Sequence, residues 1–128
     1  MQNGGIYMRR QRLASIEKEV LRVVSTALFE DVKNPKVKGM VSLTKVRVTE
    51  DLKFADLYFT ILSMDGAEVN KARVEEGLNE IRGFLRKKVS EELDLRFIPE
   101  MRIKIDDSIE HAVKISKILD DIKKQQGE

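Results

Sequence analysis

The sequence predicts an α+β fold, a single domain whose three-stranded sheet carries helices on one face. Two periodicities support this class. Apolar residues recur at three- and four-residue steps in some segments, as in helices, and alternate with polar residues in others, as in strands. The predicted order is helix, strand, strand, helix, kinked helix, strand, helix. Packing all helices on one face buries these stripes economically and leaves the other sheet face open to solvent or to a partner.

The first helix is predicted from Met8 to Phe29, because its apolar residues share one face. These residues are Leu13, Ile16, Val20, Val24 and Ala27. Residues 1–7 show no periodicity and contain two glycines, so we expect a flexible N-terminal extension there. Pro35 disfavours helical dihedrals in the residue before it, which places a turn after the helix.

Two antiparallel strands are predicted next. Apolar residues alternate in 41–43 and then, in the opposite phase, in 46–48. A phase slip of one residue predicts a β-bulge near Thr44-Lys45. The second strand spans 53–62, and the connection over 49–52 is short enough for a hairpin.

The long segment that follows predicts two helices joined by a tight kink. Its apolar stripe keeps its phase through Gly83, although glycine costs a helix interior about 1 kcal/mol relative to alanine. The stripe consists of Val74, Leu78, Ile81, Leu85 and Val89. Basic residues surround it, which fits either a solvated helix face, with Arg86 or Lys87 paired to Glu91, or a phosphate-binding surface.

A third strand and a last helix complete the predicted fold. In the strand, residues 101, 103 and 105 are expected to point inward. The open sheet face then has four candidates for partner contact, which are Arg47, Tyr58, Arg102 and Lys104. The last helix is predicted to start at Asp107 with an acidic cap, and residues 123–128 to form a flexible tail.

Composition excludes several classes of protein. Of the 128 residues, 41% are hydrophobic and 36% charged, which is typical of a charge-rich globular domain. There is no cysteine, so disulfides and thiolate metal sites are excluded. No apolar run approaches the ~20 residues of a membrane span, so we expect a cytoplasmic protein without membrane contact. The net charge of +2 still permits nucleic-acid binding if the charge is segregated onto one face.

The sequence contains no enzyme signature. His111 is the only histidine, and it has no evident partner for general-base catalysis or metal binding. Asp106-Asp107 is better explained by capping of the last helix than by a cation site. We therefore expect no catalytic residue, no metal and no cofactor.

Several short motifs resemble the ribosome-binding factor A family. The most telling run, Leu95 to Met101, is similar to the family's L-R-x-x-P-E-L with Met in the last place, and Asp106-Asp107-Ser108 matches its D-x-S. The resemblance covers nearly all of Met8 to Leu119. Further matches are Asn34-Pro35-Lys36, the hairpin run Thr49 to Leu52 with Ala55 and Tyr58, and the basic lead-in Arg9-Arg10-Gln11-Arg12.

This resemblance implies a type II KH-like domain over residues 8–122. In such factors a kink of the form A-x-G replaces the G-x-x-G loop that clamps single-stranded RNA. Ile81-Arg82-Gly83 occupies that place, with Ile81 where the family has a small residue. A second departure is Ile103, where the family tends to have an aromatic residue.

The function that the resemblance implies is non-enzymatic. Such factors bind the immature small (30S) ribosomal subunit on its 16S rRNA, promote late rRNA maturation and are associated with growth at low temperature. We expect a monomer, with ribosomal proteins and an assembly GTPase as further candidate partners. The expected phosphate-contacting residues are Arg9, Arg10, Arg12, Arg82, Arg86, Lys87, Lys88, Arg96, Arg102 and Lys104.

Three alternatives stay open at this point. A protein-interaction module would expose apolar residues, for which Phe84, Phe97 and Ile98 are candidates, although each is expected in the core. A metal-dependent nuclease would use Asp106-Asp107. A single-strand RNA regulator would need surface aromatic residues, and aromatics are only 5% of the chain.

Overall fold

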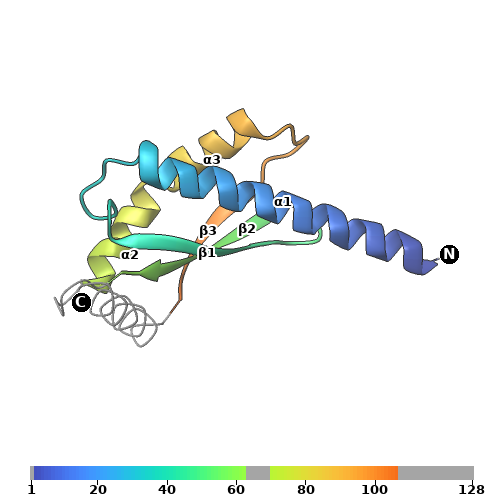
Figure 1. Ribbon diagram of the computed structural model, residues 1–128, viewed down its shortest axis with the longest axis horizontal. Coiled ribbons are helices and arrows are strands. Elements are labelled where there is room, and N and C mark those ends of the chain that lie inside the picture. Colours follow the sequence, from blue (N-terminus) through green and yellow to red (C-terminus); the bar gives the residue numbers. More distant parts are fainter. Residues whose placement is uncertain (1, 63–69, 107–128) are drawn as a thin grey trace, which may run out of the picture.

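In the part of the chain that the structure describes, three helices lie on one face of a three-stranded sheet (Figure 1). The computed structural model describes residues 2–62 and 70–106, so the helix predicted after residue 106 lies outside the described part of the chain. The elements run in the predicted order through the third strand. They are α1 (Gln2–Glu30), β1 (Val41–Val48), β2 (Phe54–Ile61), α2 (Lys71–Glu80), α3 (Arg82–Glu92) and β3 (Glu100–Asp106).

The sheet has the strand order β1-β2-β3. β1 pairs with β2 in antiparallel fashion, which confirms the predicted hairpin, and the register shifts between Leu43 and Lys45, which confirms the predicted bulge. β3 pairs with β2 in parallel. A parallel pair needs a long crossover, and α2 and α3 belong to it.

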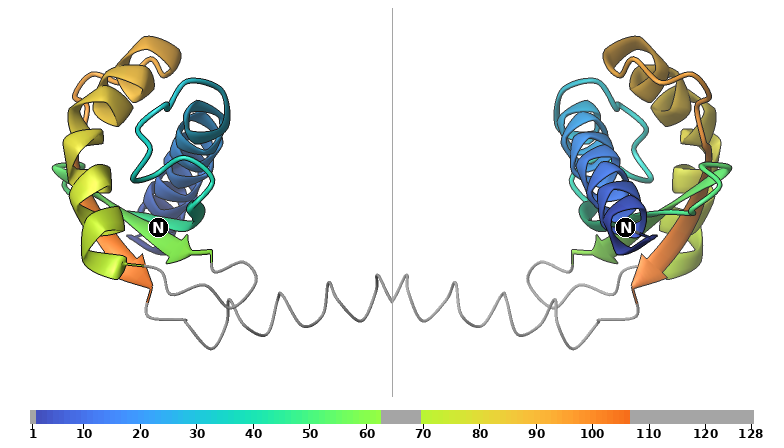
Figure 2. Two further views of the ribbon diagram at one scale, coloured as in Figure 1. Left: turned by 90° about the vertical axis from the view of Figure 1, so that its left-hand side faces the viewer. Right: turned by 90° about the vertical axis from the view of Figure 1, so that its right-hand side faces the viewer.

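The core lies between the helices and the inner face of the sheet. Ala55, Leu57 and Phe59 of β2 are fully buried, as are Val20 and Val24 of α1. Figure 2 shows all three helices on the same side of the sheet, where α1 packs against α3. The predicted stripe of the kinked helix is buried throughout: Val74, Leu78, Ile81, Leu85 and Val89.

Helix α1 begins earlier than the sequence predicted. It starts at Gln2 instead of Met8, so residues 2–7 continue the helix and the predicted start of the helix is wrong. Periodicity could not reveal this part, because the N-terminal end of α1 projects beyond the sheet (Figure 1) and needs no apolar stripe.

The kink between α2 and α3 is present, and it lies at Ile81, the first residue of the predicted run Ile81-Arg82-Gly83. Ile81 adopts φ −93° and ψ 0°, outside the helical values. It is both the C-cap residue of α2 and the N-cap residue of α3. Its amide donates to the Gly77 carbonyl at 3.1 Å, and its carbonyl accepts from the Leu85 amide at 2.9 Å. The helical path is therefore bent without losing hydrogen bonds at this residue.

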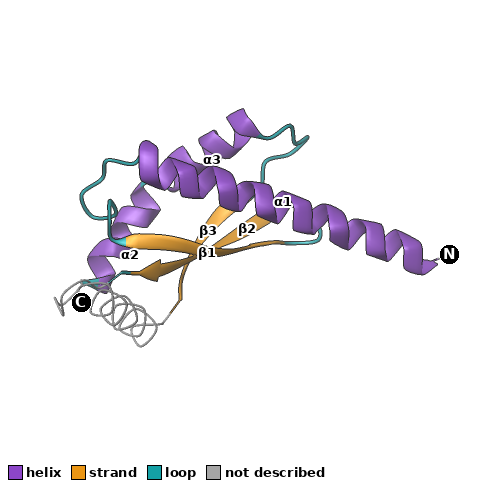
Figure 3. Ribbon diagram, viewed as in Figure 1, coloured by secondary structure: helices purple, strands orange, loops and turns teal. Residues whose placement is uncertain are grey.

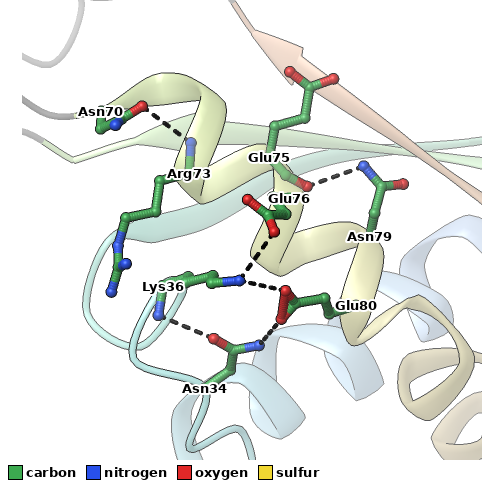
Figure 4. A network of polar contacts seen from close by, with 8 residues as sticks. All are labelled: Asn34, Lys36, Asn70, Arg73, Glu75, Glu76, Asn79 and Glu80. Carbon is green, nitrogen blue, oxygen red and sulfur yellow. Dashed lines mark hydrogen bonds and ion pairs between the residues drawn. The ribbon is translucent and has the colours of Figure 1, made fainter.

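A polar network ties the loop after α1 to α2 (Figure 4). Lys36 donates from Nζ to Glu76 at 3.2 Å and to Glu80 at 2.5 Å, and Asn34 donates from Nδ2 to Glu80 at 3.0 Å. Beneath it Gly77 lets the two backbones approach, since a Cβ there would lie 2.6 Å from Lys36 Cβ and 2.7 Å from Val37 Cγ2. The loop and α2 therefore form one tightly packed unit.

Candidate nucleic-acid interface

The structure distributes the predicted phosphate-contacting residues over three separate surfaces. Arg9, Arg10 and Arg12 lie on α1, and all three are exposed near its projecting end (Figure 1). A second group lies on α3 and the loop after it, and it consists of Arg82, Arg86, Lys87, Lys88 and Arg96. Arg102 and Lys104 lie on β3 and face away from the helices, because Met101 between α3 and the sheet is fully buried and strand residues alternate. The three groups therefore do not form one continuous patch.

The second group contains the cations best placed to meet a phosphate backbone. We call Arg82, Lys87 and Arg96 the α3 surface. All three are exposed. Within the described residues, the side chains of Arg82 and Lys87 make no hydrogen bond or ion pair, and the Arg96 guanidinium lies 5.6 Å from the centre of the Phe97 ring.

Arg86 has a structural task that the sequence did not reveal. Its guanidinium donates to the carbonyl of Ile98 at 3.0 Å and to that of Pro99 at 3.4 Å. These bonds hold the loop from α3 to β3, drawn in teal in Figure 3, against the helix. The local pairing of Arg86 or Lys87 with Glu91 is not formed. Arg86 therefore positions a loop, and its predicted phosphate contact would compete with these bonds.

Lys88 is also engaged within the chain. Its Nζ lies 3.5 Å from a carboxylate oxygen of Asp31 and 5.7 Å from the centre of the Phe84 ring. This ion pair joins α3 to the end of α1. An exposed pair of this kind contributes about 0–1 kcal/mol, so Lys88 is only partly committed to it.

The outer face of the sheet carries a second set of polar groups. Arg102 donates to both carboxylate oxygens of Asp56, at 2.5 and 3.1 Å, and its guanidinium lies 4.3 Å from the centre of the Phe54 ring. The hydrogen bonds with Asp56 raise the pKa of Arg102 above its ordinary value, so it stays charged. Lys104 is exposed on the same face. Within the described part of the chain, Arg102 is partly exposed and Lys104 exposed, as expected for the outer face of the sheet.

Exposed aromatic side chains were missed by the sequence analysis. Phe97 is 69% exposed and Phe84 is 37% exposed, so the expectation that both belong to the core is wrong. Phe29, at the end of α1, is 87% exposed and was not considered. Phe84 does not belong to the apolar stripe that contains Leu85 and Val89. It lies on the same helix face as Lys88, four residues later, and this position was the signal in the sequence that predicts an exposed side chain.

No catalytic or metal site is evident in the part of the chain that the structure describes. Residues 2–62 and 70–106 contain no cluster of three His, Asp or Glu side chains able to hold a metal ion. Asp106 is exposed at the end of β3, whereas Asp107 and His111 lie outside the described residues. Among the described helices, none is long and apolar enough to cross a membrane.

Known proteins are similar to this chain in sequence and in fold. The model of the family "Ribosome-binding factor A" matches residues 10–119. A ribosome-binding factor A from Fusobacterium nucleatum is 56% identical over 91% of this chain and 99% of its own length. One from Caldanaerobacter subterraneus is 35% identical over 94% of this chain and 98% of its own.

Solved structures agree with these sequence matches. A solution NMR structure of a Thermotoga maritima protein proposed to be a ribosome-binding factor A has a TM-score of 0.64 and 29% identity, covering 77% of this chain and 91% of that one. The crystal structure of ribosome-binding factor A from Thermus thermophilus has a TM-score of 0.62 over 73% of this chain and 93% of that one, and at 13% identity it shows the fold alone.

The fold and the site thus define a small α+β domain with separated basic surfaces and no described catalytic centre. The family match over residues 10–119 and the relatives of nearly equal length identify the family more specifically than the fold does. The chain belongs to the ribosome-binding factor A family.

Proposed function

We propose that this protein is a non-enzymatic assembly factor that binds the immature small ribosomal subunit and promotes late maturation of its 16S rRNA. Membership of the ribosome-binding factor A family carries this proposal. The protein would act as a cytoplasmic monomer, in contact with 16S rRNA through the α3 surface and the arginines of α1.

The geometry favours contact with folded RNA at the α3 surface. Arg82 and Lys87 are exposed cations on a helix, and a helix is rigid enough to hold them at fixed spacing. The kink at Ile81 replaces the loop with which KH domains clamp a single strand. Contacts of this kind position a protein by shape and phosphate, with little dependence on base sequence.

Co-sedimentation with purified subunits tests this proposal. The full-length protein should pellet with small subunits isolated from a strain that accumulates immature particles, and not with large subunits. Binding should weaken steeply as salt rises from 50 to 200 mM, because each neutralised phosphate releases counterions. Equal binding to both subunits, or no binding to small subunits at low salt, would contradict the proposal.

A second candidate is a module that docks on a ribosomal protein or an assembly GTPase with little RNA contact. The exposure of Phe97 and Phe29 favours it, since large exposed aromatic side chains often mark protein contacts. Replacing Phe97 by Ser would then abolish co-sedimentation, while replacing Arg82 and Lys87 by Glu would leave it unchanged. The opposite pattern is expected for the RNA-binding function.

A further inference from the structure

The bulge in β1 turns two cations toward the outer face of the sheet. Upstream of it Leu43 faces the core, and without an extra residue Lys45 and Arg47 would follow it inward. The register shift after Leu43 lets Val46 and Val48 face the core instead, so Lys45 and Arg47 point outward. Within the bulge, the Thr44 hydroxyl donates to the carbonyl of Tyr58 at 3.2 Å.

Across the three strands these cations form ordered rows with groups from β2 and β3. In one row Tyr58 of β2 pairs with Lys45 on β1 and with Lys104 on β3. Adjacent strands are about 4.8 Å apart, so the two lysine backbones flank the tyrosine across about 10 Å. In the next row Asp56 lies between Arg47 and Arg102. We call Lys45, Arg47, Tyr58 and Lys104, with the Asp56–Arg102 pair, the sheet platform.

The charges of the platform are arranged in a band. Asp56 is bound by Arg102, which leaves Lys45, Arg47 and Lys104 as exposed cations. Two further carboxylates lie at opposite ends of the strands: Glu50 beyond the end of β1, and Asp106 at the end of β3. The positive band between them runs across the strands, from β1 to β3, so a polyanion that follows it crosses Tyr58.

Tyr58 gives this band an aromatic centre. Its ring is partly exposed, and the Lys45 ammonium lies 5.7 Å from the ring centre. The surface beside it is hollowed: a depression of about 760 Å³ is lined by Lys45, Arg47 and Tyr58, by four other residues of β1 and the turn after it, including Glu50, and by Asp56 and Asp106, while Lys104 lies outside it. The depression is shallow and open to solvent, so it offers a surface on which a base could lie, and not an enclosed ligand pocket.

We propose that the sheet platform binds an unpaired segment of RNA, with one base stacked on Tyr58 and the adjoining phosphates held by Lys45, Arg47 and Lys104. The inference rests on the proposed function and deepens it by naming the kind of RNA that this face takes. An aromatic ring flanked by cations is the arrangement that single-stranded nucleic acid recognises, because every base offers a π-face. Duplex RNA keeps its bases stacked within the helix and gains nothing from Tyr58.

The tyrosine itself supplies the readout. The chain contains no tryptophan and two tyrosines, Tyr7 and Tyr58, so a Tyr7→Phe variant emits tyrosine fluorescence from Tyr58 alone. An eight-nucleotide single-stranded RNA without self-complementarity should quench this emission as it binds. The same RNA annealed to its complement, and inorganic polyphosphate of equal charge, should quench it far less. Equal quenching by polyphosphate would overturn the stacking step.

Substitutions at the platform separate stacking from charge. Tyr58→Leu should weaken binding of the single-stranded RNA by roughly 5- to 150-fold, whereas Tyr58→Phe keeps the ring and should bind within about 3-fold of the native protein. A double variant, Lys45→Gln with Lys104→Gln, leaves Tyr58 in place and should weaken binding and flatten its salt dependence. Native affinity in both Tyr58→Leu and the double variant would overturn the proposal.

Co-sedimentation of the same preparations distinguishes this inference from the proposed function. Protein that pellets with small subunits but shows no quenching by single-stranded RNA would overturn the sheet platform alone. Quenching by single-stranded RNA without pelleting would support the platform and contradict the proposed function. The Tyr58→Phe variant is the control for folding: it should pellet with small subunits as the native protein does, and its binding of single-stranded RNA is measured by the change in electrophoretic mobility because it lacks the Tyr58 emission.

Discussion

Two glycines of the kinked helix have opposite roles at the scale of single residues. Gly77 is buried where the loop after α1 crosses α2, and a side chain there would overlap Lys36 and Val37. Gly83 is exposed, and an added Cβ would meet no atom within 4 Å. The kink was predicted at Ile81-Arg82-Gly83 because glycine disfavours a helix interior, whereas the close approach at Gly77 involves a loop distant in sequence and has no local signal.

We predict that Gly77→Ala destabilises the protein by about 1–3 kcal/mol, since the added methyl group overpacks a tight contact with backbone-anchored atoms. Gly83→Ala is the matched control, and it should stabilise by up to about 1 kcal/mol because alanine favours the helix. Urea unfolding at pH 7 measures both. Equal effects of the two substitutions would contradict the packing seen at Gly77.

The Lys36–Glu80 contact makes part of the stability depend on pH. The hydrogen bond from Lys36 is the main cause that lowers the pKa of Glu80 from its ordinary 4.5, and the hydrogen bond from Asn34 adds to it. A lowered pKa means that the contact stabilises the fold above pH 4.5 and ceases to do so as pH falls through the lower folded value. Lys36, whose pKa Glu80 and Glu76 raise, keeps its charge throughout this range.

Glu80→Gln should therefore cost stability at pH 7 and progressively less below pH 4.5. Chemical unfolding of the native protein and the variant from pH 7 to pH 3 measures the difference. Glu75→Gln is the control, because its carboxylate side chain makes no hydrogen bond or ion pair among the described residues. A difference between native protein and Glu80→Gln that persists unchanged to pH 3 would contradict this assignment.

At the scale of elements, the sequence predicted what local periodicity controls. The buried stripe of α2 and α3 and the bulge after Leu43 were both visible as phases of apolar residues, and both are confirmed. The parallel pairing of β3 with β2 was not predicted, because strand order depends on contacts between distant segments. The row that joins Lys45, Tyr58 and Lys104 depends on that pairing and could not be predicted either.

The loop from α3 to β3 shows the same limit. The sequence does not distinguish Arg86 from Lys87 as adjacent cations of one helix. In the structure Arg86, and not Lys87, donates to the carbonyls of Ile98 and Pro99. Arg86→Ala should therefore lower stability by about 1 kcal/mol and increase amide exchange around residues 93–99. Lys87→Ala should stay within about 0.5 kcal/mol of the native protein. Indistinguishable exchange in the two variants would contradict the loop-holding role of Arg86.

At the scale of the whole molecule, basic groups lie on both sides of the sheet. The α3 surface belongs to the helical layer, and the sheet platform lies on the opposite face. A net charge of +2 conceals this distribution, which composition alone could not predict. Two separated surfaces would allow one small domain to contact two RNA segments at once, a folded one by phosphate position and an unpaired one by stacking.

The salt dependence of small-subunit binding tests the α3 surface most directly. Replacing Arg82 and Lys87 by Ala removes two proposed phosphate contacts, so the slope of log K against log salt should decrease by about 1.5. A Lys33→Ala, Lys38→Ala variant changes the net charge equally, through exposed lysines of the loop after α1, and should keep the native slope. Equal slopes in the native protein and in the variant with Arg82 and Lys87 replaced would contradict phosphate contact by the α3 surface.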